Sequence, residues 1–246
     1  KTVDASNLTP EFISGTLQEA GGIEANVASG YHAIEFMLWG QDLNGNGPGA
    51  GSRPVTDYSL ENCTNGNCER RRDYLGAASD LLVADLEEMV ANWKEGGAAR
   101  LAVEESGVAG GLSTILTGMG SLSYGELAGE RMKLGLLLGD PEEEHDCFSD
   151  NTHNSHRYDA VGIRTAYTGV YKRPDGTEMT GPSLADLLAA KDPAIAEELS
   201  ADLDSTVTAM ETMVDRAEKV EAYDQMIAVG NDEGNATVQA AIDGLI

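Results

Sequence analysis

The stretch YLGAASDLLVADLEEMVANW, residues 74–93, decides the fold class of this 246-residue chain. Its apolar residues recur three and four positions apart, which is the spacing of one face of an α-helix. They are Tyr74, Leu75, Ala78, Leu81, Leu82, Leu86, Met89, Val90 and Trp93. No strand pattern of similar strength occurs in the sequence. We therefore predict an all-α protein whose helices are long enough for four-helix bundles.

Further helices are expected on both sides of this central helix, which we extend to residues 67–95. The expected ranges of these further helices are 10–20, 23–39, 98–105, 108–138, 151–171, 183–191, 193–221 and 230–246. Three of them end directly before a glycine, namely Gly21, Gly40 and Gly139. Residues 40–66 are rich in Gly, Asn and Pro and are expected to form a connector. Residues 172–183 are expected to form a hairpin-like loop around Asp175-Gly176.

The chain is strongly acidic, with 42 acidic and 16 basic residues and a formal net charge of -26. Such a surface repels phosphate backbones, so nucleic acid is not an expected partner, and it attracts cations. No run approaches the roughly 20 apolar residues that a membrane-spanning helix needs. A signal peptide is not visible, but a chain whose leader had been removed would look the same, so the cytoplasm is not implied.

Two cysteines flank a turn signal in the segment NCTNGNCE. Cys63 and Cys68 enclose Asn65-Gly66, so the two thiols are expected to close a small loop as a disulfide. This pairing indicates an oxidising compartment. A zinc half-site is the alternative, but a second Cys/His pair of suitable spacing is lacking. The third cysteine, Cys147, is expected to be either a buried thiol or paired with a cysteine outside this chain.

The segment GYHAIEFMLWG, residues 30–40, places His32 and Glu35 three residues apart in an apolar run. Side chains with this spacing share one helix face. Buried polar groups need a partner, so the two residues form either an internal pair or part of a metal site. Metalloprotease motifs of the H-E-x-x-H or H-x-x-E-H kind need a second histidine four residues after the first. With His32 as the first, that position is Phe36, so neither motif is present.

Two further clusters contain possible ligands. In SYGELAGERM, Glu126 and Glu130 lie four residues apart on an apolar helix, where they bind a metal or pair with basic groups such as Arg131. In SDNTHNSHRYD, the candidates are His153, His156 and Asp159.

Three blocks in this order resemble the imelysin family. They are GYHAIEFMLWGQDLNG with its G-x-H-x-x-E core, SYGELAGERM, and EEEHDCFSDNTHNSH, residues 142–156. The resemblance extends over nearly the whole chain and is nearest to the iron-regulated protein A-like envelope proteins of bacteria.

The resemblance implies two helical bundles related by an approximate two-fold axis, with a shared site between them. We place them at residues 1–107 and 108–246, and the helix at 108–138 is long enough to belong to both. His32 and Glu35 are then the metal-binding motif, and Glu130 is matched through the GERM block. Glu126, His153, His156 and Asp159 are candidates for an additional site. The implied cofactor is a metal ion, with iron expected first and copper or zinc as alternatives.

The resemblance also implies a periplasmic or outer-membrane location, with any lipid anchor outside this chain, and a role in iron acquisition or homeostasis. Family members usually carry helices before the segment that matches residues 2–7, and these are missing here. We expect that a separate N-terminal fragment supplies them or that the chain associates with itself. Envelope iron-uptake proteins are the other expected partners.

Three functions follow from these residues. The first is a metal-binding envelope protein, which we favour. The second is a metallopeptidase, but a catalytic metal needs about three protein ligands and an open position, and His32 and Glu35 supply only two. The third is a module that binds a non-metal ligand or a partner protein, with the same pair as hydrogen-bonding groups. An enzymatic function is not expected.

Overall fold

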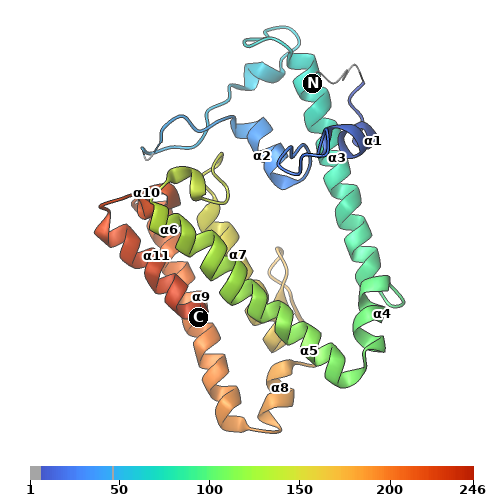
Figure 1. Ribbon diagram of the computed structural model, residues 1–246, viewed down its shortest axis with the longest axis vertical. Coiled ribbons are helices and arrows are strands. Elements are labelled where there is room, and N and C mark those ends of the chain that lie inside the picture. The colour runs from blue at the N-terminus through green and yellow to red at the C-terminus, as the bar shows by residue number, and fades with distance from the viewer. Residues whose placement is uncertain (1–6, 46) are drawn as a thin grey trace. The chain divides into compact units, whose positions relative to one another are not determined.

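The computed structural model describes residues 7–45 and 47–246, and whatever we predict for residues 1–6 and 46 lies outside this part of the chain. The chain divides into two compact units. The first holds residues 1–43 and 50–111, and the second holds residues 44–49 and 112–246. The chain is mostly helical, which confirms the predicted fold class (Figure 1).

The first unit is built on one long helix. Its elements are α1 (Pro10–Phe12), the π-helical turn η1 (Ile13–Leu17), α2 (Tyr31–Trp39), the 3-10 turn η2 (Val55–Tyr58), α3 (Cys68–Trp93), α4 (Ala98–Glu105) and the start of α5 (Gly107–Gly120). Buried Ile13 packs against Ala77 and Ala78 of α3. Partly buried apolar side chains surround this small core, namely Leu17, Ile34, Tyr74 and Leu81.

The helix predicted at residues 23–39 begins later in the structure. The range 23–39 contains helix only from Tyr31 to Trp39, because Gly30 has a φ of 87°. A positive φ is incompatible with a right-handed helix, and glycine adopts it without steric cost. The preceding residues therefore form an irregular segment.

The connector of the first unit is organised around a buried carboxylate, Asp57. Thr64 Oγ1 and Asn65 Nδ2 donate hydrogen bonds to Asp57 Oδ1 over 3.0 and 2.7 Å. Arg53 Nη1 lies 3.5 Å and Arg71 Nη1 3.9 Å from Asp57 Oδ2. Although burial acts to raise the pKa of Asp57, these hydrogen bonds and positive charges lower it below its ordinary value. The carboxylate is therefore held in its ionised form.

A disulfide joins Cys63 and Cys68, the pair expected from the sequence. It closes the loop that presents Thr64 and Asn65 to Asp57. Cys147 lies outside this disulfide.

The second unit contains a four-helix arrangement. Its elements are the remainder of α5, the π-helix η3 (Ser121–Lys133), α6 (Leu134–Leu138), the 3-10 turn η4 (Pro141–Glu143), α7 (Thr152–Thr168), β1 (Val170–Lys172), β2 (Glu178–Thr180), α8 (Leu184–Ala189), α9 (Pro193–Lys219), α10 (Tyr223–Ile227) and α11 (Asp232–Leu245). In this unit α9 packs against both α7 and α11, and η3 packs against the same two helices. Four helical segments therefore surround one core.

That core is rich in methionine and small apolar residues. Met132, Met210, Met213 and Met226 are fully buried in it. The other members are Leu127, Ala128, Ala160, Tyr223, Ile227, Val238, Ala241, Ile242 and Leu245. Unbranched methionine side chains adapt to irregular gaps, which suits a core that also contains a π-helix.

The helix expected at 108–138 is continuous but changes its winding. Residues 121–133 form a π-helix between α5 and α6. Its buried residues are Leu127, Ala128 and Met132, so the buried face recurs after four to five residues rather than 3.6. Long π-helical segments are rare, and short ones are frequent at functional sites.

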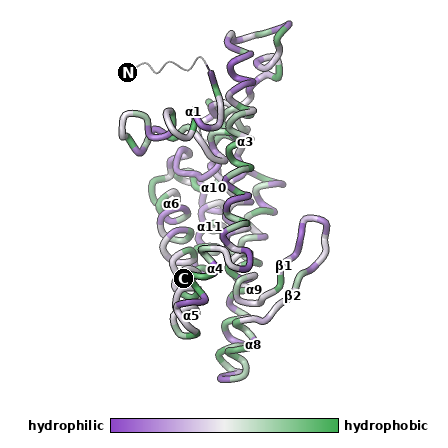
Figure 2. Tube along the Cα trace, turned by 90° about the vertical axis from the view of Figure 1, so that its right-hand side faces the viewer, coloured by the Kyte–Doolittle hydropathy of each residue, from purple (hydrophilic) through white to green (hydrophobic). Residues whose placement is uncertain are grey.

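The helix expected to reach residue 171 ends at Thr168, because Gly169 takes a left-handed conformation with a φ of 64°. The chain then forms a two-stranded antiparallel hairpin, in which Tyr171 pairs with Met179. The expected hairpin-like loop is thus a true hairpin, and its tip is hydrophilic (Figure 2).

Candidate metal centre

The helix α2 carries the G-x-H-x-x-E motif. A glycine stands at each end of it, with a backbone φ angle that other residues rarely adopt. Gly30 precedes it with a φ of 87°, and Gly40 follows it with a φ of 80°. Both angles lie in the region that side chains rarely adopt. The two glycines fix the helix to nine residues, so His32 lies in its first turn.

The connector holds the C-terminal end of α2. Arg53 donates its backbone N–H to Trp39 O over 2.8 Å, and its Nη2 donates to Phe36 O over 3.3 Å. The Arg53 guanidinium also stacks 5.4 Å from the centre of the Phe36 ring. The Tyr58 hydroxyl donates to Met37 O. A cation and donors at the last carbonyls stabilise a helix end.

The segment before α2 is held as well. Tyr74 of α3 donates its hydroxyl to Ala28 O over 2.6 Å. Gln18 Oε1 accepts from Ala28 N over 2.8 Å and from Ser29 Oγ over 3.0 Å. Both ends of α2 are therefore anchored within the first unit, which gives its side chains a defined position.

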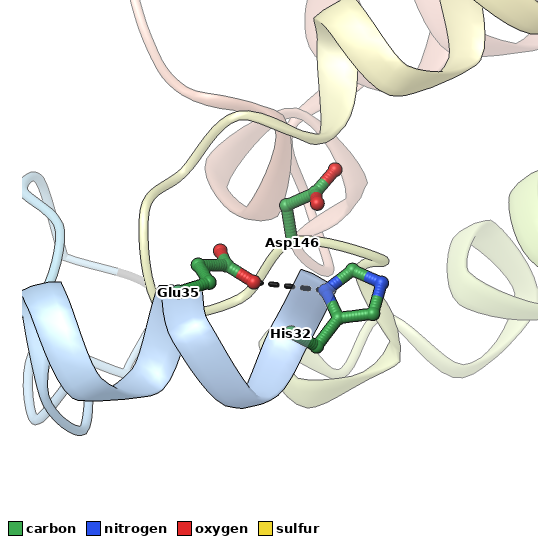
Figure 3. A group of neighbouring side chains, drawn as sticks. All are labelled: His32, Glu35 and Asp146. Atoms are coloured by element: carbon green, nitrogen blue, oxygen red, sulfur yellow. Dashed lines mark hydrogen bonds and ion pairs between the residues drawn. The ribbon is translucent and has the colours of Figure 1, made fainter. Parts of the chain in front are cut away.

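His32 and Glu35 face each other on this helix (Figure 3). The His32 Nδ1 atom lies 2.9 Å from Glu35 Oε2. The Glu35 side chain is 2% exposed and the His32 side chain is 40% exposed. The Tyr31 ring packs edge-on against the His32 ring, with 5.7 Å between the ring centres. Asp146, which is also drawn in Figure 3, belongs to the second unit and is described with it below.

This spacing suits two kinds of chemistry. In a hydrogen bond, His32 Nδ1–H donates to the carboxylate, which fixes the tautomer and orientation of the ring. In a metal site, two ligands at about 2.1 Å from one ion and at right angles lie about 3.0 Å apart. The observed 2.9 Å agrees with both. The His32–Glu35 pair therefore fits a transition metal, and it supplies two ligands.

The two glutamates predicted on η3 are exposed. Glu126 and Glu130 both lie on the solvent-exposed part of this π-helix. The expectation that burial would force partners on them is wrong, because the wider winding buries their neighbours instead. Arg131, the expected partner, places its Nη1 within 2.7 and 2.8 Å of the ring nitrogens of His145. Whether Glu130 binds a metal stays a prediction.

The residues predicted on α7 are more buried. Burial lowers the pKa of His156 to about 3, and the neighbouring basic side chains add to this effect. Its two ring nitrogens have no hydrogen-bond partner among the described residues. Burial also lowers the pKa of His153 and raises that of Asp159. The imidazole of His156 is therefore neutral at physiological pH.

Other acidic residues, which no sequence motif indicated, converge in this unit. Glu144, Asp150 and Asp224 each place one carboxylate oxygen within 4.8 Å of the other two. Glu144 is 6% exposed and Asp224 is 1% exposed. Glu144 directly follows η4, which packs against α10, the helix that carries Asp224. The sequence did hold one signal, since Asp224 stands in the apolar run AYDQMIAV.

Burial raises the pKa of Glu144 to about 9. A hydrogen bond from Thr152 Oγ1 to Glu144 Oε2, 2.9 Å long, acts to lower it, and the negative charges of Asp224, Asp150 and Asp146 raise it further. Carboxylates that share a low-dielectric space cannot all ionise without compensation. At neutral pH this group holds a proton unless a cation replaces it.

Asp146 lies in the loop between η4 and α7, which also carries Glu144, and it is fully buried. Its backbone N–H donates to Thr152 Oγ1 over 2.8 Å, and the Ser155 hydroxyl donates to its Oδ2. The Thr152 hydroxyl thereby links the loop to the first turn of α7, because it accepts from Asp146 and donates to Glu144.

The imelysin family model matches residues 2–246 of this sequence. The chain belongs to the imelysin family. This membership agrees with the helical architecture and with the resemblance carried by the three sequence blocks. No curated protein matches the chain. Among the helices of the described residues, none is both long and apolar enough to span a membrane.

Proposed function

We propose that this imelysin-family chain is a metal-binding protein of the bacterial cell envelope that takes part in iron acquisition or homeostasis. The observation that carries the proposal is the His32–Glu35 pair, whose Nδ1 and Oε2 atoms lie 2.9 Å apart on an anchored helix. Iron accepts a mixed set of imidazole nitrogen and carboxylate oxygen ligands. Copper and zinc are the alternatives for the same pair.

The envelope location is supported by the disulfide between Cys63 and Cys68. Structural disulfides persist in oxidising compartments such as the periplasm and are rare in the cytosol. The net charge of -26 also favours a protein that attracts cations and avoids nucleic acid. We propose self-association or envelope iron-uptake proteins as partners.

The metal proposal is tested by anaerobic titration with Fe²⁺ alone, followed by desalting and metal analysis. The variants are His32→Ala and Glu35→Gln, with Glu24→Gln as control, because Glu24 is an exposed acid of the same unit. We expect His32→Ala to weaken iron binding by at least about 100-fold, since even an outer-shell partner contributes 10- to 100-fold. Glu24→Gln should bind like the wild type.

Equal iron content in His32→Ala, Glu35→Gln and wild type would refute the site. Circular dichroism of each variant distinguishes lost ligation from lost folding, because a folded variant keeps the helical spectrum. The location is tested separately by cell fractionation with a cytosolic marker protein. Recovery of the protein with the cytosolic marker contradicts the envelope proposal.

A further inference from the structure

The Glu144, Asp150 and Asp224 carboxylates form a second group of potential ligands, and the proposed function makes no use of it. All three belong to the second unit, whereas His32 and Glu35 belong to the first. Two of the three, Glu144 and Asp224, are almost completely buried. Negative charges brought together in a poorly solvated space repel one another strongly. Such a group is stable when it holds protons or when a cation binds between its members.

The tyrosine that precedes Asp224 gives independent evidence for a ligand at this position. Tyr223 is fully buried, and its hydroxyl has no hydrogen-bond partner among the described residues. The Glu144 charge adds to the effect of burial in raising the Tyr223 pKa, so the hydroxyl lies within electrostatic reach of the Glu144 carboxylate. A buried hydroxyl without a partner is costly. A hydrated cation among the carboxylates would place water near this hydroxyl.

His156 adds to this evidence from the side of α7. Its ring is fully buried and packs edge-on against the Tyr223 ring, with 5.2 Å between the ring centres. Both nitrogens of the ring lack a hydrogen-bond partner among the described residues. Tyr223, which directly precedes Asp224, and the His156 ring packed against it are thus two buried polar side chains without a hydrogen-bond partner among the described residues.

The ligand set of the carboxylate group indicates the kind of cation. Magnesium usually keeps several waters and binds one or two carboxylates, whereas calcium takes more oxygen ligands in a flexible geometry. The oxygens of this group lie within 4.8 Å of one another, a separation that Ca–O bonds of about 2.3–2.6 Å can span. Ligands made only of carboxylate oxygen prefer hard cations over soft transition metals.

We propose that Glu144, Asp150 and Asp224 bind a calcium-sized, oxygen-preferring divalent cation. The ion bridges the loop that follows η4 to α10, and its water ligands meet the Tyr223 hydroxyl. This site is separate in its ligands from the His32–Glu35 pair and does not depend on the proposed function.

The test is calorimetric titration of chelator-treated wild-type protein with Ca²⁺ alone, together with thermal unfolding with and without Ca²⁺. The variants are Asp224→Asn and Glu144→Gln. Glu143→Gln is the matched control, since it makes the same change at an exposed neighbouring residue. At about 100 times the Kd, Ca²⁺ should raise the Tm of the wild type by about 5–10 °C. Asp224→Asn and Glu144→Gln should each weaken Ca²⁺ binding by at least about 100-fold, and Glu143→Gln should not.

The metal-free Tm gives a second readout that does not depend on loss of binding alone. Asp224→Asn removes a like charge, so it should keep or raise the metal-free Tm while abolishing the Ca²⁺-induced increase. A wild type without Ca²⁺ binding, or binding that survives both substitutions, overturns the proposal. His32→Ala should leave Ca²⁺ binding intact, and Asp224→Asn should leave His32-dependent iron binding intact. Each of the two proposals can therefore be refuted without the other.

Discussion

The His32–Glu35 pair and the Glu144–Asp150–Asp224 group bury acidic side chains in opposite ways. In the first unit, the buried Glu35 carboxylate has an imidazole nitrogen at 2.9 Å. In the second unit, the buried Glu144 carboxyl is surrounded by other acids, and its pKa is raised to about 9. A complementary pair compensates its own burial, whereas a group of like charges depends on protons or on a cation. Removal of one glutamate should therefore have opposite consequences in the two regions.

The largest expected difference concerns pH. Folded Glu144 has a pKa of about 9 against an ordinary value of 4.5. Between these values the folded state binds the proton that the unfolded state has lost, so the contribution to stability is complete below about pH 4.5 and disappears as the pH rises through about 9. In chelator-treated, metal-free protein, the free energy of unfolding should thus fall as the pH rises, by up to about 1.4 kcal/mol per pH unit.

This dependence is measured by urea unfolding between about pH 7 and 9.5, above the range in which ordinary histidines titrate. Glu144→Gln should flatten the dependence, because the amide carries no proton to release. Glu143→Gln should retain it. If the free energy of unfolding depends on pH equally in Glu144→Gln and wild type, the neighbouring acids do not keep Glu144 protonated. These acids are Asp146, Asp150 and Asp224.

A smaller effect is expected for the same substitution in the first unit. Glu35→Gln removes the acceptor charge from His32 and should destabilise the metal-free protein by about 1 kcal/mol. At pH 7 the folded state keeps the Glu144 proton that the unfolded state has lost, so Glu144→Gln, which needs no proton, should raise the free energy of unfolding instead of lowering it. Urea unfolding of the two variants side by side measures this contrast. A loss in Glu144→Gln equal to that in Glu35→Gln would remove the distinction between the two regions.

The smallest effect on stability is expected on η3. Glu126→Gln and Glu130→Gln change exposed side chains, so each should alter the free energy of unfolding by less than about 0.5 kcal/mol. Iron retention should nevertheless differ between them, because only Glu130 is expected as a ligand from the family resemblance. Equal iron retention in the two variants would remove Glu130 from the ligand set.

Much of the fold was predictable from the periodicity of the sequence. The helix α3 appears where the apolar spacing of residues 74–93 predicts it, because one helix face repeats every 3.6 residues. Local backbone geometry caused the errors. Gly30 delays the start of α2, and Gly169 ends α7 before the hairpin. The π-helical winding of residues 121–133 has no counterpart in a pattern that assumes an α-helix.

The two candidate sites differ in how far the sequence could reveal them. His32 and Glu35 share one helical turn, so their three-residue spacing alone predicted that the two side chains meet. Asp224 is distant from Glu144 and Asp150 in sequence, and no local rule connects them. Their convergence depends on the packing of η4 against α10.

The sequence by itself determined the helical class, the local His32–Glu35 pair and the small cysteine loop, because each follows from interactions between residues close together in the chain. Only the tertiary structure decided that Glu144, Asp150 and Asp224 converge beside the buried Tyr223 hydroxyl. It also decided that Glu126 and Glu130 remain exposed. Burial and the proximity of like charges arise when distant segments pack, and these two properties set the charge state of an acid.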